Sequence, residues 1–175
     1  RPELLGVKHL GVGLAEGLGD CAVLVGKGRG AALRTRNGLG GRNLNSEWEK
    51  EVASYKGITV SGYPNYFKLN GPNTGTGHSS QLSYMEAATG YIAQAIRAVK
   101  RDASIQAIDA RPELQEAYVA NMRRKMRNTV WQNAACTAFY RRNMTEEVTS
   151  LSPEPASGFI LSRKWFHLGD YRLLK

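Results

Sequence analysis

The longest periodic pattern of apolar residues in the chain follows residue 80. Apolar side chains recur there every three or four positions, at Leu82, Met85, Ala88, Ile92, Ala95, Ile96 and Val99. This spacing places one apolar stripe along a helix of about five turns. Ser79 or Ser80 is a natural N-cap for it. The sequence therefore predicts a long amphipathic helix that buries one face.

A short apolar run and a glycine-rich segment precede this helix. The run contains Tyr66, Phe67 and Leu69, and we interpret it as a buried strand that ends at Asn70 and Gly71. Residues 71–80, GPNTGTGHSS, connect this strand to the helix. The order of strand, glycine loop and capped helix predicts an open α/β sheet with the loop at the carboxyl edge of the strands, where ligands bind.

Two further helices are predicted by apolar residues spaced four apart. These residues are Leu44, Trp48 and Val52 in the first helix, and Leu114, Tyr118 and Met122 in the second. We expect Asn45 or Ser46 to cap the first helix and Pro112 to begin the second. A short extended segment over 105–108 should precede the second helix.

The glycine-rich amino-terminal stretch contains a GxGxxxG pattern at residues 11–17. Such a loop can cradle a pyrophosphate where it leads from a strand into a helix. Here Gly6 and Lys8 interrupt the strand that should precede it, and no acidic residue lies about 20 positions beyond it as a partner for a ribose. The context favours a flexible glycine-rich stretch over a nucleotide site.

Composition is that of an ordinary globular protein of about one domain, with 175 residues, 42% of them hydrophobic and 22% charged. Cys21 and Cys136 give neither a metal-ligand spacing nor a disulfide framework, so two reduced thiols are expected. No stretch approaches the ~18 apolar residues of a membrane helix, and no signal peptide is visible. We therefore expect a cytoplasmic protein without a membrane partner.

The formal net charge of +9 favours association with anions but does not choose among them. The main basic cluster is Arg123, Arg124, Lys125 and Arg127. One alternative function is therefore a basic nucleic-acid-binding module, in which these cations contact phosphates and Tyr and Trp side chains stack on bases. Another alternative is a truncated product that does not fold stably, because an incomplete sheet exposes an apolar edge.

Candidate chemistry concentrates at the glycine loop. His78 could act there as an acid, a base or a hydrogen-bond donor. Neither Ser79 nor Ser80 lies in a GxSxG elbow, and the three histidines give no metal-ligand spacing. Free amides and the positive end of the helix dipole would stabilise a negative charge close to residues 77–81, which favours a cofactor. The alternative, in which the glycines only allow a tight turn, stays open.

A known family resembles this part of the chain. Residues 57–99 read GITVSGYPNYFKLNGPNTGTGHSSQLSYMEAATGYIAQAIRAV. They resemble the carboxy-terminal part of flavin-binding monooxygenases of the Baeyer-Villiger type, which carry G-[IM]-x-V-x-G-[FY]-P-N-x-F, a GPNxGxGH loop and a long helix. The resemblance extends upstream to Gly40 and downstream to Cys136.

The resemblance implies an activity and a fold. The family uses FAD and NADPH to insert one oxygen atom from O2 beside a ketone, or to oxidise a heteroatom compound. The implied fold is the carboxy-terminal part of a Rossmann-like FAD domain with an incomplete sheet over 40–100, followed by a mixed helical extension over 101–175. Residues 1–39 stay unassigned.

The FAD fingerprint, the FxGxxxHxxxW signature and the NADP-binding domain of the family are not found in these 175 residues. The chain therefore resembles a carboxy-terminal fragment whose partner is the missing amino-terminal part of the same enzyme. Alone, it is expected to be inactive and to retain no FAD. No nucleic-acid partner and no metal are expected.

Specific residues follow from the resemblance. The helix that begins near Ser79 should point its N-terminus at the flavin ring, where it would stabilise the negative charge of the reduced flavin near N1 and the C2 carbonyl. His78 and Asn73 are the candidate catalytic residues. The candidate cofactor-binding residues are Gly71, Pro72, Thr74, Gly77, Ser79, Ser80, Gln81 and Trp131. Trp131 falls where relatives place a mobile-loop tryptophan near NADPH, although packing in the core is its simpler role.

Overall fold

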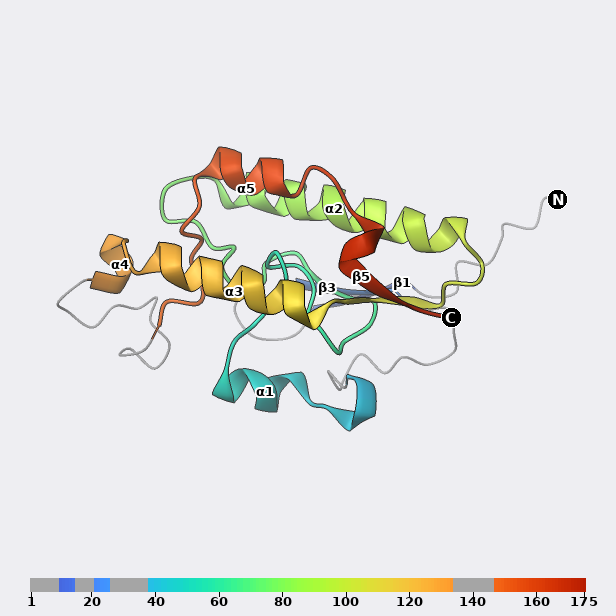
Figure 1. The fold of residues 1–175 in the computed structure, drawn as a ribbon. Helices are drawn as coiled ribbons and strands as arrows, with labels where there is room; N and C mark the ends of the chain where they lie inside the picture. The colour runs from blue at the N-terminus through green and yellow to red at the C-terminus, as the bar shows by residue number, and fades with distance from the viewer. Residues whose placement is uncertain (1–9, 15–20, 26–37, 134–146) are drawn as a thin grey trace.

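The computed structural model describes residues 10–14, 21–25, 38–133 and 147–175 (Figure 1). The described elements are, in chain order, β1 (Leu10–Leu14), β2 (Cys21–Val25), the 3-10 helix η1 (Leu39–Gly41), α1 (Leu44–Lys50), β3 (Tyr66–Lys68), α2 (Gln81–Arg101), β4 (Ala107–Ala110), α3 (Pro112–Met126), α4 (Val130–Asn133), α5 (Ala156–Ser162), the 3-10 helix η3 (Leu168–Asp170) and β5 (Tyr171–Leu174). The expected mixed α/β class is confirmed.

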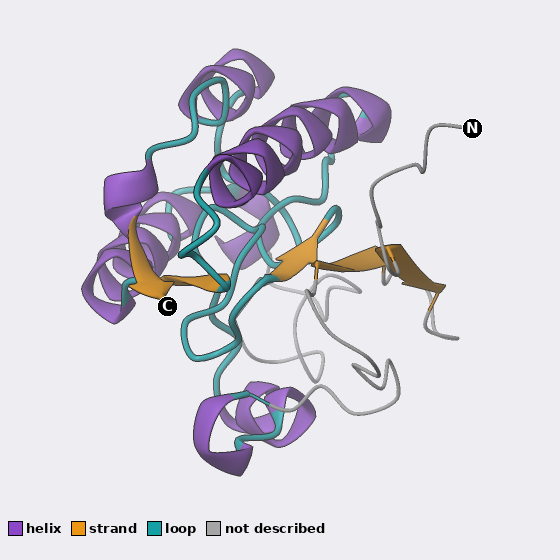
Figure 2. Ribbon diagram, turned by 90° about the vertical axis from the view of Figure 1, so that its right-hand side faces the viewer, coloured by secondary structure: helices purple, strands orange, loops and turns teal. Residues whose placement is uncertain are grey.

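The strands form two small antiparallel sheets, in the orders β1-β2-β3 and β4-β5. Figure 2 shows them crossing the middle of the molecule, with α2 and α5 on one side and α1 on the other. The GxGxxxG pattern begins inside β1, which pairs antiparallel with β2. The described backbone therefore places its first glycines in a strand pair and not in a loop that leads into a helix.

α2 is the predicted long helix, and the core forms along one of its faces. The apolar positions Ala88, Ile92, Ala95 and Val99 are buried as expected. Leu82 was expected on the same stripe, but it is 70% exposed. Tyr84 lies two positions further, about 200° around the helix, and is completely buried. The buried stripe therefore begins with Tyr84 and continues through Tyr91, so the expectation for Leu82 is wrong.

The start of α1 also differs from the expected position. Asn43 is the N-cap, and its Oδ1 accepts hydrogen bonds from the amides of Asn45, at 3.0 Å, and Ser46, at 3.2 Å. A cap at Asn45 or Ser46 is therefore wrong, since the helix begins at Leu44, whose side chain is completely buried. For α2 the expected cap position is confirmed at Ser80, although its side chain makes no capping hydrogen bond.

Asn65 joins the two sheets. It lies just before β3 with a positive φ of 55°. Its amide donates to the carbonyl of Ile108 in β4 at 3.0 Å, and its Oδ1 accepts from the Ile108 amide at 3.1 Å. Its Nδ2 donates to the carbonyl of Gln106 at 3.1 Å. These bonds hold the start of β3 against β4, and the glycine loop begins three residues after the end of β3.

A cluster of buried tyrosines lies between α2 and the carboxy-terminal strand. The hydroxyl of Tyr171 is 3.1 Å from that of Tyr91 and 3.3 Å from Oγ1 of Thr59. Burial raises the pKa of Tyr171 from 10.0 to about 12. The hydroxyl therefore keeps its proton in the folded chain at pH values where the unfolded chain loses it.

This difference predicts alkaline destabilisation. The folded-state pKa lies above the unfolded one, so stability is fully present below about pH 10 and is lost as the pH rises towards 12. Urea denaturation at pH 8 and at pH 11 should show a loss of about 1 to 2 kcal/mol from this residue. Tyr171→Phe should be less sensitive to the same pH change, and an equal sensitivity would contradict the prediction.

A close approach between Gly57 and the glycine loop predicts a second effect. Gly57 has a φ of 71°, and a Cβ there would overlap Cγ2 of Thr74 and lie 2.8 Å from the carbonyl oxygen of Pro72. Gly57→Ala should therefore lower the free energy of unfolding by about 2 kcal/mol or more in urea denaturation.

Gly90, in the exposed part of α2, is the matched control, because a Cβ there meets nothing within 4 Å. Gly90→Ala should instead raise stability by about 0.5 to 1 kcal/mol. Effects of the same sign at both positions would refute the packing of Gly57 against the loop.

Candidate functional site

The glycine loop, residues 71–80, divides into a buried half and an exposed half. Gly71, Pro72 and Thr74 are buried, whereas Gly77 and the three residues that follow it are exposed. The first half therefore packs inside the protein, and the second half is exposed to solvent at the start of α2.

Hydrogen bonds within the loop fix its buried half. Oγ1 of Thr74 donates to the carbonyl of Gly71 at 2.6 Å and lies 2.9 Å from Oδ1 of Asn70. Gln81, the first residue of α2, ties the loop to the helix. Its Nε2 donates to Asn70 Oδ1 and to the Thr74 carbonyl, and its Oε1 accepts from the Thr76 amide at 3.1 Å. Gln81 therefore bridges the loop and α2, and its contact with a cofactor stays a prediction.

A distant segment, residues 149–152, supports the loop from its other side. The Asn73 amide donates to the Thr149 carbonyl at 2.7 Å, and the Gly75 amide donates to the Ser150 carbonyl at 2.8 Å. The Gly75 carbonyl accepts from the Ser152 amide at 2.7 Å, which completes a short parallel bridge. Asn73 has a φ of 57°, and its Nδ2 donates to the Leu151 carbonyl at 3.2 Å. Its side chain is thus directed at this backbone.

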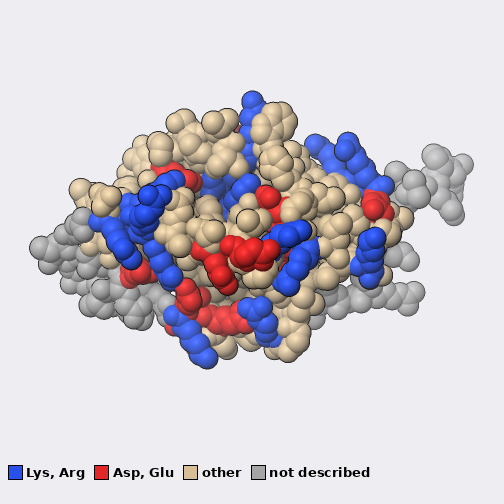
Figure 3. Space-filling model, in the orientation of Figure 1, with Lys and Arg blue, Asp and Glu red and all other residues tan. Residues whose placement is uncertain are grey.

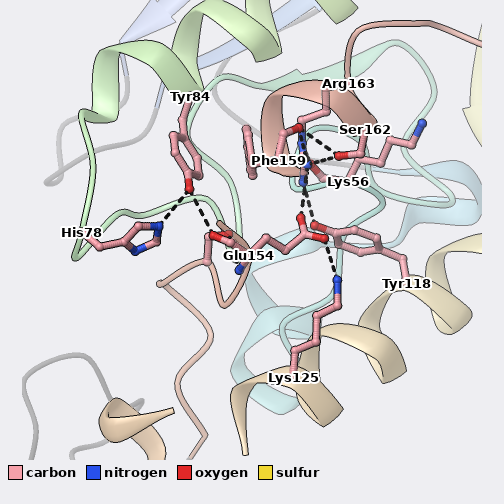
Figure 4. A network of polar contacts seen from close by, with 10 residues as sticks. Lys56, His78, Tyr84, Tyr118, Lys125, Glu154, Phe159, Ser162 and Arg163 are labelled. Atoms are coloured by element: carbon pink, nitrogen blue, oxygen red, sulfur yellow. Dashed lines mark hydrogen bonds and ion pairs between the residues drawn. The ribbon is translucent and has the colours of Figure 1, made fainter. Parts of the chain in front are cut away.

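His78 lies in the exposed half, next to two aromatic side chains. Its ring stacks on Trp131 with centroids 6.1 Å apart and an interplanar angle of 26°. The hydroxyl of Tyr84 lies 3.5 Å from His78 Nε2 and donates to the carbonyl of Glu154 at 3.3 Å (Figure 4). Burial raises the pKa of the Tyr84 hydroxyl, so it stays protonated at neutral pH.

Trp131 reaches the loop from α4. A Cβ on Gly77 would lie 2.7 Å from Cζ2 of Trp131, so the glycine leaves the space in which the indole lies. The structure therefore brings together His78, Gly77 and Trp131, which the sequence analysis named as site residues. Tyr84 and Glu154 were missed, because a buried tyrosine on a helix stripe and a glutamate between two prolines carry no distinctive pattern.

The first turn of α2 is open to solvent. Ser79 and Ser80 are exposed, as is Leu82, the second residue of the helix. α2 has 21 residues, and its dipole places partial positive charge at this end. An anionic or electron-rich group can therefore approach the start of α2 without displacing packed side chains.

Two cavities among the described residues do not include residues 77–80. One, of about 130 Å³, is lined by apolar side chains of α3, among them Val119, Met122 and Met126, and reaches Asn73. The other, of about 410 Å³, lies between α1 and α3. Both lie on the α3 side of the molecule, whereas His78 and the start of α2 face solvent.

Two of the four cations at the basic end of α3 are paired with acidic groups. Arg123 lies 2.8 Å from Glu51 and 2.9 Å from Glu147, and Lys125 lies 2.9 Å from Glu154. Figure 3 shows blue and red side chains interspersed over the face that carries α1 and α3. This pairing offsets the charge of two of the four cations that the alternative function as a nucleic-acid-binding module would use.

Other expected features fall partly outside the described residues. Cys136, for which a reduced thiol is expected, lies outside them. Within the described part of the chain, no group of three or more His, Cys, Asp or Glu side chains is arranged to hold a metal ion. No described helix combines the length and the apolar character needed to cross a membrane.

Comparison with curated proteins identifies related monooxygenases. A Baeyer-Villiger monooxygenase of Pseudomonas aeruginosa is 32% identical over 136 residues, which are 78% of this chain and 26% of the relative. One of Streptomyces coelicolor is 28% identical over 138 residues, with 79% and 26% covered. An FAD-binding monooxygenase of Aspergillus niger is 34% identical over 108 residues, 59% of this chain and 18% of the relative. No family model matches the chain.

Solved structures of monooxygenases share the fold. An oxidised steroid monooxygenase bound to NADP matches 79% of this chain with a TM-score of 0.65 and 20% identity, over 26% of its own length. Cyclohexanone monooxygenase from Rhodococcus sp. Phi1 bound to NADP+ matches 78% of this chain with a TM-score of 0.62 and 19% identity, also over 26% of its length.

The chain thus shares the fold of part of these solved monooxygenases. In sequence, the chain is related to Baeyer-Villiger and FAD-binding monooxygenases, which confirms the resemblance found in residues 57–99. It spans about a quarter of the length of the first two relatives.

The hydrogen bonds of Gln81 predict the effect of Gln81→Glu. The carboxylate still accepts a hydrogen bond from the Thr76 amide. It cannot donate to Asn70 Oδ1 or to the Thr74 carbonyl as the amide Nε2 does, so its oxygens repel these two acceptors. Urea denaturation at pH 7 should show a loss of about 1 to 3 kcal/mol.

Part of this loss should return as the pH falls, because acceptor oxygens raise the folded-state pKa of the new carboxyl group and protonation restores a donor. Gln106→Glu, at an exposed side chain outside the loop, is the control and should change stability little. A Gln81→Glu variant as stable as this control would contradict the bridging role of Gln81.

Proposed function

We propose that this chain supplies the loop and helix that face the flavin in an FAD- and NADPH-dependent monooxygenase. The enzyme would insert one oxygen atom from O2 beside a ketone, or oxidise a heteroatom compound. The observation that carries the proposal is that the first turn of α2 is exposed to solvent. The loop before it is held by hydrogen bonds along its buried half. The relationship to curated Baeyer-Villiger monooxygenases supports the reaction class.

The residues at the start of α2 fit one edge of a flavin. His78, Ser79 and Ser80 are exposed there, and the helix end carries partial positive charge. The bound flavin would supply the redox chemistry that activates O2. The helix dipole would stabilise negative charge on the N1 and C2 carbonyl edge by about 1 kcal/mol.

The two halves of the loop have different roles in this proposal. Gly77, His78, Ser79 and Ser80 meet the cofactor or the substrate, together with Trp131. Gly71, Pro72, Asn73, Thr74 and Gln81 hold these residues in place through the hydrogen bonds and packing described above. His78 holds or donates a proton at a ring nitrogen facing the substrate, and Trp131 shields one face of its ring from water.

The remaining parts of the proposal concern the rest of the enzyme. The chain corresponds to the carboxy-terminal part, with residues 40–100 ending the FAD-binding domain and 101–175 forming an extension. The missing amino-terminal part would bind the adenine, ribose and pyrophosphate groups. The low cysteine content favours a cytoplasmic location.

A chimera tests the proposal. Residues 38–175 replace the matching segment of the Pseudomonas aeruginosa relative, and flavin content and NADPH oxidation are measured. The chimera should retain FAD and oxidise NADPH in the presence of a ketone. His78→Ala should lower kcat about 100-fold or more, because it removes a positioned proton donor.

His167→Ala is the matched control, since His167 is exposed at the start of η3 and lies outside the loop. A folded chimera that contains no FAD would refute the proposal. Equal kcat values in the two histidine variants would refute the role of His78. The separate 175-residue chain should show no stoichiometric flavin absorbance after purification, and such a band would contradict the fragment interpretation.

A further inference from the structure

Arg163 is a buried cation whose guanidinium is held by hydrogen bonds and by contact with an aromatic ring. It follows α5 directly, is 1% exposed, and its guanidinium lies 3.4 Å from the centroid of the Phe159 ring. Its hydrogen-bond acceptors are the Lys56 carbonyl at 2.9 Å, the Tyr118 hydroxyl at 2.8 Å, the Phe159 carbonyl at 3.1 Å, Ser162 Oγ at 2.7 Å and Glu154 Oε2 at 3.4 Å (Figure 4). A buried guanidinium is costly unless its donors are satisfied, so this geometry is closely specified.

The first of these contacts reaches one support of the glycine loop. The Lys56 carbonyl belongs to a tight turn in which Lys56 and Gly57 have φ angles of 55° and 71°. Gly57 packs directly against the loop, because a Cβ on Gly71 would overlap the Gly57 carbonyl and one on Gly57 would overlap Thr74. By holding the Lys56 carbonyl, Arg163 fixes the surface on which the buried half of the loop rests.

The contact of Arg163 with Glu154 reaches the other support of the loop, residues 149–152. The Glu154 carboxylate lies between Arg163 and Lys125, which is 2.9 Å away, and its side chain is 11% exposed. The Glu154 amide donates to Ser152 Oγ at 3.2 Å, and Ser152 ends the segment that bonds to Asn73 and Gly75. The Glu154 carbonyl accepts from Tyr84, whose hydroxyl oxygen lies 3.5 Å from His78 Nε2.

We propose that Arg163 is a positioning residue for the glycine loop, because its one guanidinium holds both supports of residues 71–78. It lies 85 or more residues downstream of these residues and touches none of them in the contacts described above. It acts on the loop through Lys56 and Gly57 on one side and through Glu154 on the other. That this positioning serves catalysis rests on the proposed function.

Hydrogen exchange in the 175-residue chain tests the proposal without any cofactor. Arg163→Lys keeps the positive charge, but a single nitrogen cannot reach both the Lys56 carbonyl and Glu154 as the guanidinium fork does. NMR-detected exchange of the Asn73, Gly75 and Ser152 amides should become about tenfold faster, relative to amides in the middle of α2. The ring signals of His78 should also shift, because Tyr84 loses its fixed acceptor.

Arg172→Lys is the matched control. Arg172 also pairs with a buried carboxylate, since its Nη2 lies 2.8 Å from Oδ2 of Asp109, which is 1% exposed, but Asp109 belongs to β4. This control should leave the exchange of the Asn73, Gly75 and Ser152 amides and the His78 signals unchanged. A purely structural role for Arg163 would instead accelerate exchange equally in α2 and in the loop, and that result would overturn the proposal.

Tyr118→Phe is a second variant, which serves for the same measurement if Arg163→Lys does not fold. It removes one acceptor of Arg163 and should accelerate the same three amides by a smaller factor, without affecting the middle of α2. Unchanged exchange in the loop of both folded variants would also overturn the proposal. Because no flavin is needed, this failure is distinguishable from failure of the chimera to bind FAD.

Discussion

The short parallel bridge between Gly75 and Leu151 is the constraint on which the rest of the site depends. It brings a segment near the carboxy terminus against a loop that lies more than 70 residues earlier in the sequence. Backbone groups alone make the hydrogen bonds of this bridge. The side chains of Asn73, Thr74 and Gln81 add hydrogen bonds that fix the rest of the loop's buried half. A fixed loop base then leaves residues 77–80 directed outward at the helix start.

Local patterns predicted the elements that position the site. The run at Tyr66 and Phe67, the spacing after residue 80 and Pro112 each identified an element that the structure contains, because burial of one face dictates such spacing. The errors arose at helix ends: α1 stops at Lys50, so that Val52 lies outside it. Asn43 caps α1 and Leu82 faces solvent because the exact phase of a helix depends on tertiary contacts that the sequence does not display.

The sequence predicted only those residues of the candidate site that lie close together in the chain. His78 and its glycines stand out as a motif, whereas Trp131 was placed by resemblance and Tyr84 was assigned no role. Glu154 and Arg163 contribute to the site through a buried ion pair. No sequence pattern distinguishes this one arginine among the 24 basic residues. Long-range polar pairing of this kind is a property of the folded chain, so it becomes visible only with the structure.

Asn65 has a consequence for how the molecule responds to mechanical load. With two hydrogen bonds to Ile108 of β4 and one to Gln106, just before β4, this residue joins two separate sheets. Tension applied at the carboxy terminus therefore has a hydrogen-bonded path from β5 through β4 to the start of β3. Because the glycine loop follows β3, pulling on the end of the chain should also strain the base of this loop.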